Sequence, residues 1–181
     1  QQLRADHEAA AALCPKMGMR SCKGLREAKA VYWRGNGLSA ADLALLGTLT
    51  SVLPALEKLV LCEEGAGPDG VQRLAEGLGA GALPAMTQLS IDNMHVGDAG
   101  ASALAAALGR GALPRLHILV LTDTAIGDAG LVALAPALRR LPALAFLSLD
   151  NTPFGDEGLA ALVAPPPPAD APTTTTGGLT E

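Results

Sequence analysis

The chain has 181 residues, of which 49% are hydrophobic, 17% are charged and 2% are aromatic, and its net charge is -5. This length and apolar content suit one domain with a buried core and exclude a disordered chain. The acidic balance gives no indication of nucleic-acid binding, although residues 1–34 carry seven Lys or Arg against three Asp or Glu.

The amino-terminal segment, residues 1–24, has apolar and alanine positions compatible with a helix, and we expect it to cap the first layer of the structure that follows. It lacks the apolar core of a signal peptide and an initiator methionine, which indicates a processed chain or a fragment. No apolar run approaches the roughly 18 residues of a membrane span. The three cysteines, Cys14, Cys22 and Cys62, have no metal-like spacing and form no disulfide framework, which favours a reducing compartment such as the cytoplasm.

A repeat occupies about residues 25–164. Four Leu-Pro pairs, which begin at Leu53, Leu83, Leu113 and Leu141, follow one another at intervals of 30, 30 and 28 residues. Each pair precedes apolar residues with a period of two, which predicts a strand with one buried face. Apolar residues at i, i+3 and i+7 then predict a helix with one buried stripe. With a degenerate first unit, we expect five parallel strands centred near Trp33, Leu61, Ile91, Leu121 and Leu149.

The predicted helix starts share a short motif. Ser39 and Asp42 resemble a capping box in the first unit. Later units have Gly97, Gly127 and Gly155 at the cap position, and each glycine is followed by an aspartate: Asp98, Asp128 and Asp156. We interpret these aspartates as carboxylates at the positive helix end, not as a functional motif. Another glycine of each unit, Gly100, Gly130 or Gly158, is expected to let the helix approach the strand layer.

The combination of LxxLxL, a turn, "IGDAG" and an Ala/Leu helix resembles the leucine-rich repeats of the ribonuclease inhibitor type. The resemblance implies an α/β fold, a curved solenoid with parallel strands on the concave side and helices on the convex side. It also implies a protein-binding module whose inner face makes the contacts. The asparagine that usually follows the strand is kept only at Asn36, and the matching positions elsewhere are Glu64, Met94, Thr124 and Thr152. The two threonines can still bond to turn backbone.

The carboxyl-terminal residues 165–181 form a low-complexity Pro/Thr segment. Pro166 must stop the last helix near Ala164, and Leu179 stands where the next LxxL would start. We therefore expect a tolerated loop, followed by the start of a further repeat in a longer protein. A ligand for a proline-reading domain is a less favoured interpretation.

The sequence contains no pattern typical of catalysis or metal binding. His7, His95 and His117 are expected in the cap, in a turn and at a strand edge, so they form no ligand set. A row of acidic residues near the strand ends is expected to place its carboxylates in much the same solvated environment, whereas an acid-base pair needs differing ones. The row consists of Glu63, Glu64, Asp92, Asp123 and Asp150. We predict no enzyme activity, no cofactor and no metal.

The outward strand side chains offer a binding surface. Ile118, Val120 and Phe146 are expected to form an apolar patch flanked by acids, which is typical of a protein-binding site. The predicted contact residues are Tyr32, Arg34, Lys58, Val60, Glu63, Gln88, Ser90, Asp92, Ile118, Val120, Asp123, Phe146, Ser148 and Asp150. The predicted partner is another protein with a basic or mixed surface, on its own or in a larger assembly, and neither nucleic acid nor membrane insertion is expected.

Three alternatives stay open. In the first, the small outward residues of the strands bind no partner: they are merely tolerated at their positions, or another part of the same protein covers them. The chain could instead be a structural or linker subunit that makes its contacts through the convex helices or the Pro/Thr loop. A GTPase activator would need an arginine poised near a nucleotide, for which Arg34 is the candidate at a strand end.

Overall fold

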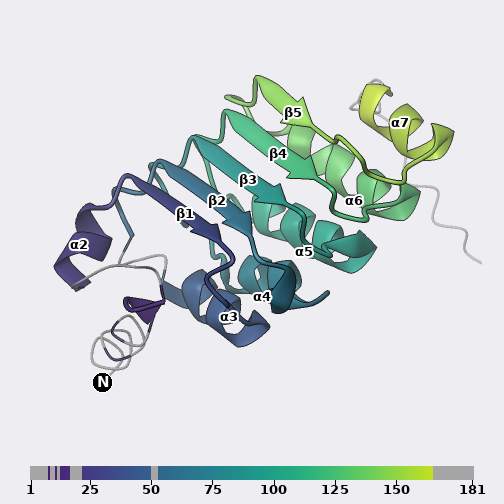
Figure 1. Ribbon diagram of the computed structural model, residues 1–181. Helices are drawn as coiled ribbons and strands as arrows, with labels where there is room; N and C mark the ends of the chain where they lie inside the picture. The colour runs from purple at the N-terminus through teal and green to yellow at the C-terminus, as the bar shows by residue number, and fades with distance from the viewer. Residues whose placement is uncertain (1–7, 9–10, 12, 17–21, 50–52, 165–181) are drawn as a thin grey trace, which may run out of the picture.

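The computed structural model describes residues 8, 11, 13–16, 22–49 and 53–164. Five strands form one parallel sheet in chain order, as predicted (Figure 1). Their bounds are β1 Ala30–Arg34, β2 Lys58–Cys62, β3 Gln88–Asp92, β4 Ile118–Thr122 and β5 Phe146–Ser148. The last strand ends one residue before Leu149, near which it was expected to be centred.

A helix follows each strand, and these helices lie along one face of the sheet (Figure 1). They are α3 Ala40–Thr48, α4 Gly70–Gly77, α5 Gly97–Gly109, α6 Asp128–Arg139 and α7 Asp156–Val163, while a short 3-10 helix, η2 Glu64–Ala66, precedes α4. Each helix packs against the next one in chain order. Each strand-helix unit therefore contacts mainly its neighbours, as in a solenoid.

The core lies between the sheet and the helix layer. Each inward strand residue of β2 to β4 is at most 3% exposed: Leu59, Leu61, Leu89, Ile91, Leu119 and Leu121. The predicted helix stripes, such as Leu131, Leu134 and Leu138, are also buried. In the last unit the matching residues are half-buried or exposed, because no described element packs over them.

The amino-terminal residues that the structure describes lie against the first unit. Leu13 and Cys14 are buried, Lys16 forms a 2.6 Å ion pair with Asp42, and the Asn36 side-chain amide donates to the Lys16 carbonyl. Helix α2 Cys22–Glu27 crosses the expected boundary between a cap at 1–24 and repeats from residue 25. The rest of the predicted cap, and the predicted loop at 165–181, lie outside the described residues.

Helix α3 starts with the capping box that the sequence predicts. The Ser39 hydroxyl accepts from the Asp42 amide, and the Asp42 carboxylate accepts from the Ser39 amide at 2.8 Å. Burial raises the pKa of Asp42, but the hydrogen bonds from Lys16 and Ser39 and the Lys16 charge outweigh burial and hold this pKa below its usual value.

The aspartates of the later helix starts also accept amide hydrogen bonds, but from the next helix. Asp98 Oδ1 accepts from the amides of Gly127 and Gly130, at 2.8 and 2.9 Å. Asp128 repeats this arrangement one unit later. Asp98 and Asp128 also stand in the first turn of their own helices, as expected, and neighbouring helices lie close enough for each carboxylate to reach across to the next helix.

The helix glycines permit this close approach between helices. A Cβ atom at Gly130 would lie 2.7 Å from Asp98 Oδ1 and 3.0 Å from the Cβ atom of Ala101, and both residues belong to α5. The expected approach toward the strand layer is wrong, because the atoms nearest to such a Cβ belong to the neighbouring helix and to the preceding turn.

The turn threonines behave differently from one another. The Thr152 hydroxyl donates to the Leu149 carbonyl at 2.6 Å, which confirms the expected bond to turn backbone. The Thr124 side chain is fully buried, and its hydroxyl has no hydrogen-bond partner among the described residues. For Thr124 the expectation is wrong.

Candidate functional site

The sheet face opposite the helices is here called the open face (Figure 1). Most of the predicted contact residues belong to the five strands of this sheet. Strand register places them in rows across the sheet, as predicted. One row consists of Tyr32, Val60, Ser90, Val120 and Ser148, and another of Lys58, Gln88, Ile118 and Phe146. A row runs across neighbouring strands, so its side chains can form one continuous surface.

Two aromatic side chains are exposed on the open face. Phe146 on β5 is 54% exposed and Tyr32 on β1 is 56% exposed, so they mark opposite ends of the sheet. Ile118 and Val120 are half-buried beside Phe146. The predicted apolar patch thus consists of one protruding ring next to two partly covered aliphatic side chains.

Val60 and Ser90, in the middle of the sheet, are not accessible. Val60 is 4% exposed and Ser90 is 5% exposed, and the Gln88 side-chain amide donates to the Ser90 hydroxyl at 3.2 Å. Both residues lie on central strands, with a strand paired on either side. The expectation that these two residues present contact surface is therefore wrong.

Glu63 does not lie where the sequence pattern predicts. It is 2% exposed, and its carboxylate accepts from the backbone amides of Asn36, Gly37 and Leu38 at 2.7, 3.1 and 3.4 Å. The predicted rim position is wrong because the carboxylate binds the turn between β1 and α3. Glu63 therefore joins the first two units instead of facing a partner.

The other residues just after the strands adopt a left-handed backbone conformation. The φ angles of Asn93, Asp123 and Asn151 are 50°, 52° and 53°. Asn and Asp tolerate this conformation better than most residues do. The backbone thus accounts for these residue types, while the Asp123 side chain stays exposed at the rim.

Charge on the open face is divided between its two ends. On the β1–β2 side, Arg34 is exposed, and the Lys58 ammonium lies 5.4 Å from the centre of the Tyr32 ring. On the β3–β5 side, the acids are Asp92, Asp123 and Asp150, and the Ser148 hydroxyl donates to Asp150 at 2.6 Å. A partner would therefore meet cations at one end of the sheet and carboxylates at the other.

Asp92 lies where these two groups meet. One of its carboxylate oxygens is 3.9 Å from the Arg34 guanidinium. Burial raises the pKa of Asp92, the Arg34 charge partly offsets this effect, and the nearby Asp123 carboxylate raises the pKa further. The fold therefore disfavours the charged form of this side chain.

The described residues hold no cluster of side chains suited to binding a metal ion. No three His, Cys, Asp or Glu side chains among them lie close enough to hold a metal ion. His95 and His117 are exposed in different units, and His7 lies outside the described part of the chain. Cys62, half-buried on β2, is not in a disulfide there.

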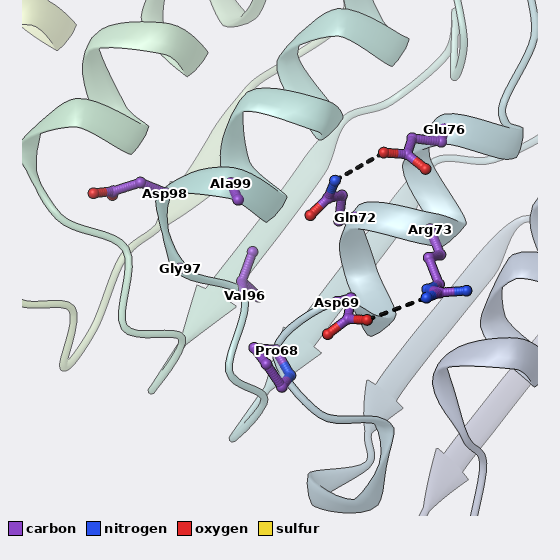
Figure 2. A pocket seen from close by; sticks show the side chains of 9 residues that line it. All are labelled: Pro68, Asp69, Gln72, Arg73, Glu76, Val96, Gly97, Asp98 and Ala99. Atoms are coloured by element: carbon purple, nitrogen blue, oxygen red, sulfur yellow. Dashed lines mark hydrogen bonds and ion pairs between the residues drawn. The ribbon is translucent and has the colours of Figure 1, made fainter.

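A pocket that the sequence pattern does not predict lies between the starts of α4 and α5 (Figure 2). It has a volume of about 410 Å³, and its lining includes Asp69, Gln72, Arg73, Glu76 and Asp98. Asp69 pairs with Arg73 at 3.4 Å, and Gln72 donates to Glu76 at 2.9 Å. The Asp98 carboxylate points away from α4 and accepts hydrogen bonds from the α6 amides (Figure 2). The polar lining is already paired, so this pocket is a weaker candidate site than the open face.

Comparisons with known proteins identify the repeat. A family model described as "Leucine Rich repeat" matches residues 113–135, which contain β4 and the start of α6. No curated protein matches the sequence. Among solved structures, the chain is similar to one described as the crystal structure of the TLR13-ssRNA13 complex, with 21% identity and a TM-score of 0.42. This likeness covers 78% of the present chain and 19% of that chain, so the present chain spans about a fifth of its length.

The fold is thus a leucine-rich-repeat solenoid with a five-stranded parallel sheet alternating with helices. Within the described ranges, no helix is both long enough and apolar enough to cross a bilayer. Leucine-rich-repeat domains generally mediate protein-protein interaction.

Proposed function

We propose that this chain is a non-catalytic protein-binding module, of the ribonuclease inhibitor type of leucine-rich repeat, that uses the open face of its sheet. The observation that carries the proposal is the exposure of Phe146 beside Ile118 and Val120. An aromatic ring that protrudes from an apolar patch with a polar rim is typical of an interface anchor. The polar rim here is Ser148, Asp150 and Asp123.

The charge distribution indicates the class of partner. The carboxylates of Asp92, Asp123 and Asp150 favour a basic or mixed protein surface over the phosphates of a nucleic acid. The same carboxylates disfavour single-stranded RNA, which the TLR13 complex contains, as a ligand of this chain. The ion pair also leaves Arg34 as a partner of Asp92, not as a residue directed at a nucleotide. We further infer a reducing compartment, since the three cysteines of the sequence form no disulfide framework.

A pair of variants tests the proposal. The chain is immobilised, a captured protein is identified by mass spectrometry, and its dissociation constant is measured for the wild type and for the double variant Ile118→Ser, Phe146→Ser. Loss of an aromatic anchor commonly costs about 2 kcal/mol, so the double variant should bind about thirtyfold more weakly. Val132→Ser is the matched control, because Val132 is 43% exposed but lies on the helix side.

Two results together would overturn the proposal. One is unchanged binding by the double variant, and the other is loss of binding when charges on the helices are reversed or residues 165–181 are deleted. The chain would then act as a structural or linker subunit through its other surfaces. Circular dichroism of each variant verifies that folding is retained, which separates a binding defect from unfolding.

A further inference from the structure

Two rows of the open face have a large side chain at one edge of the sheet and a short one at the other edge. One row begins with Ala30 on β1 and ends with Phe146 on β5, and another begins with Tyr32 and ends with Ser148. Phe146 is 54% exposed, Tyr32 is 56% exposed, and Ala30 is exposed as well. Each protruding ring therefore shares its row with a short side chain at the far edge of the sheet.

A third row has opposite charges at its two edges. Arg34 is the last residue of β1, and its side chain is 66% exposed. Asp150 lies two residues after Ser148, at which β5 ends, and it is exposed. The Asp123 amide donates to the Asp150 carbonyl at 3.0 Å, so Asp150 continues the pairing with β4. A guanidinium at one edge and a carboxylate at the other thus lie at the same position along the strands.

A twofold axis can bring two copies of this face together in two ways, and closed dimers of identical chains are usually twofold. If the axis runs across the strands, β1 of one copy lies over β1 of the other, and each charged end of the sheet meets itself. If the axis runs along β3, β1 of one copy lies over β5 of the other, because β1 and β5 are the two edges of the sheet (Figure 1). Positions along the strands are then preserved. Only this second arrangement places the cations of one copy over the carboxylates of the other.

The second arrangement matches all three rows at once. Each row then meets the same row of the second copy in reverse order, so its two ends face each other. The facing pairs are Ala30 with Phe146, Tyr32 with Ser148 and Arg34 with Asp150, and each pair occurs twice. A ring opposite a short side chain packs without a clash, and shape complementarity is typical of protein interfaces. A guanidinium opposite a carboxylate adds a charge-assisted hydrogen bond.

The middle of the open face contributes less to this match. Val60 faces Val120 of the second copy, but Val60 and Ser90 are nearly buried in their own sheet. Asp92 opposes the match, because the two Asp92 carboxylates face each other near the axis and repel. Arg34 of the same copy lies 3.9 Å from Asp92 and offsets part of this repulsion. The favourable contacts of the arrangement therefore lie at the two edges of the sheet.

We propose that the open face binds a second copy of the same chain, in a twofold dimer whose axis runs along β3 and in which Arg34 of each copy pairs with Asp150 of the other. The inference rests on the proposed function, because it names the partner of that same surface. The charges of the open face favour a protein surface of mixed charge, and a second copy supplies such a surface in the matching order.

An exchange of charges between copies tests the dimer. The mass of the 1–181 chain is measured by sedimentation equilibrium over a wide range of concentrations, for the wild type, Arg34→Glu and Asp150→Arg. Either variant places like charges at both ends of the interface, so its dimer should dissociate at least about tenfold more readily than that of the wild type. An equal mixture of the two variants should form a heterodimer, because both facing pairs are then again of opposite charge.

Arg73→Glu is the matched control. Arg73 is exposed and lies 3.4 Å from an aspartate, as Arg34 lies near Asp92, but it belongs to α4 on the helix side. Its dimer should dissociate like that of the wild type. Circular dichroism verifies that each variant is folded.

Three results would each overturn the dimer: a wild type that is monomeric at every concentration, association of Arg34→Glu and Asp150→Arg as strong as that of the wild type, and a mixture of the two that stays monomeric. The double variant Ile118→Ser, Phe146→Ser distinguishes this failure from that of the proposed function. If a monomeric chain captures a different protein and loses it in the double variant, the dimer is wrong and the open face is still the binding surface. Unchanged capture by the double variant of a monomeric chain would contradict both.

Discussion

Asp98 at the start of α5 accepts a hydrogen bond from the backbone amide of Gly127 at the start of α6, across 2.8 Å. The same oxygen accepts from Gly130, so one side chain satisfies two amides that the α6 helix cannot satisfy itself. A charged acceptor at a helix start is also favoured by the helix dipole. The contact couples neighbouring units. The stability of a repeat protein depends on such contacts between neighbours.

Asp98→Ala should therefore reduce the free energy of unfolding by about 1–2 kcal/mol, the usual cost of losing a helix cap. Urea unfolding followed by circular dichroism measures this change. Asp69→Ala is the matched control, because Asp69 lies at the start of α4 but makes no cap hydrogen bond. Its exposed pair with Arg73 is worth only a few tenths of a kcal/mol. Equal losses in the two variants would contradict the role of Asp98 as a cap for the next unit.

The burial of a leucine side chain between repeat units should also determine how much unfolding free energy is lost when it is truncated to alanine. Leu121 is 0% exposed, so Leu121→Ala should cost about 2–5 kcal/mol of unfolding free energy. Leu159, which occupies a repeat position on α7, is 49% exposed, and Leu159→Ala should cost about 1 kcal/mol or less. Urea midpoints of the two variants provide the comparison. A loss at Leu159 as large as that at Leu121 would show that the exposed side of α7 is covered in solution.

The repeat units were predictable because their signals are local and recur. Alternation near Leu61 and helical spacing at Leu131, Leu134 and Leu138 each predict an element and its buried side. The recurrence fixes the register, so the rows on the open face follow from the residue pattern alone. The end of the last helix was also predictable, because Pro166 cannot continue it.

Contacts between units were not predictable in the same way. The sequence places Asp98 at a helix start but does not say that it reaches the next helix, since this depends on the spacing between helices. The residue pattern predicts Glu63 in an exposed row, yet its carboxylate binds the turn after β1. Leu83 and Leu113 have φ angles of 49° and 54°, which no local preference of leucine predicts. These features arise from packing between units that are distant in the sequence.

The raised pKa of Asp92 predicts that its charge destabilises the fold. Its pKa is higher in the folded chain than in the unfolded chain, so its favourable contribution is present at low pH and is lost as the pH rises through the folded value. Asp92→Asn should therefore increase the urea midpoint near neutral pH and have less effect below about pH 3.5. Glu157→Gln serves as the exposed control. A lower midpoint for Asp92→Asn at neutral pH would show that the Arg34 pair outweighs burial.

Asp42 should have the opposite pH dependence. Its pKa is lower in the folded chain than in the unfolded chain, so its stabilising contribution is present above the unfolded value and is lost as the pH falls through the folded value. Asp42→Asn should thus destabilise the chain near neutral pH, and the difference from the wild type should vanish in acid. Unfolding free energies of both chains between about pH 2 and pH 7 measure this convergence. A difference that stays constant in acid would mean that the charge of Asp42 is not the cause.

Thr124 and Thr152 occupy matching turn positions but should respond in opposite ways to the same substitution. The Thr124 hydroxyl is buried without a partner among the described residues. On folding it therefore loses its hydrogen bonds to water and gains none in their place. Valine keeps the branched shape and removes this unpaired group. Thr124→Val should therefore increase the unfolding free energy by about 1 kcal/mol.

The Thr152 hydroxyl, in contrast, donates to the Leu149 carbonyl at 2.6 Å. Thr152→Val removes this bond and leaves the carbonyl one donor short, so it should reduce the unfolding free energy by about 1 kcal/mol. Because the substitution is identical, its effects on β-branching and on the unfolded chain largely cancel between the two variants. Urea unfolding of both variants gives the sign directly. A loss of stability in Thr124→Val would show that this hydroxyl has a partner, such as a buried water, and that the two turns are equivalent after all.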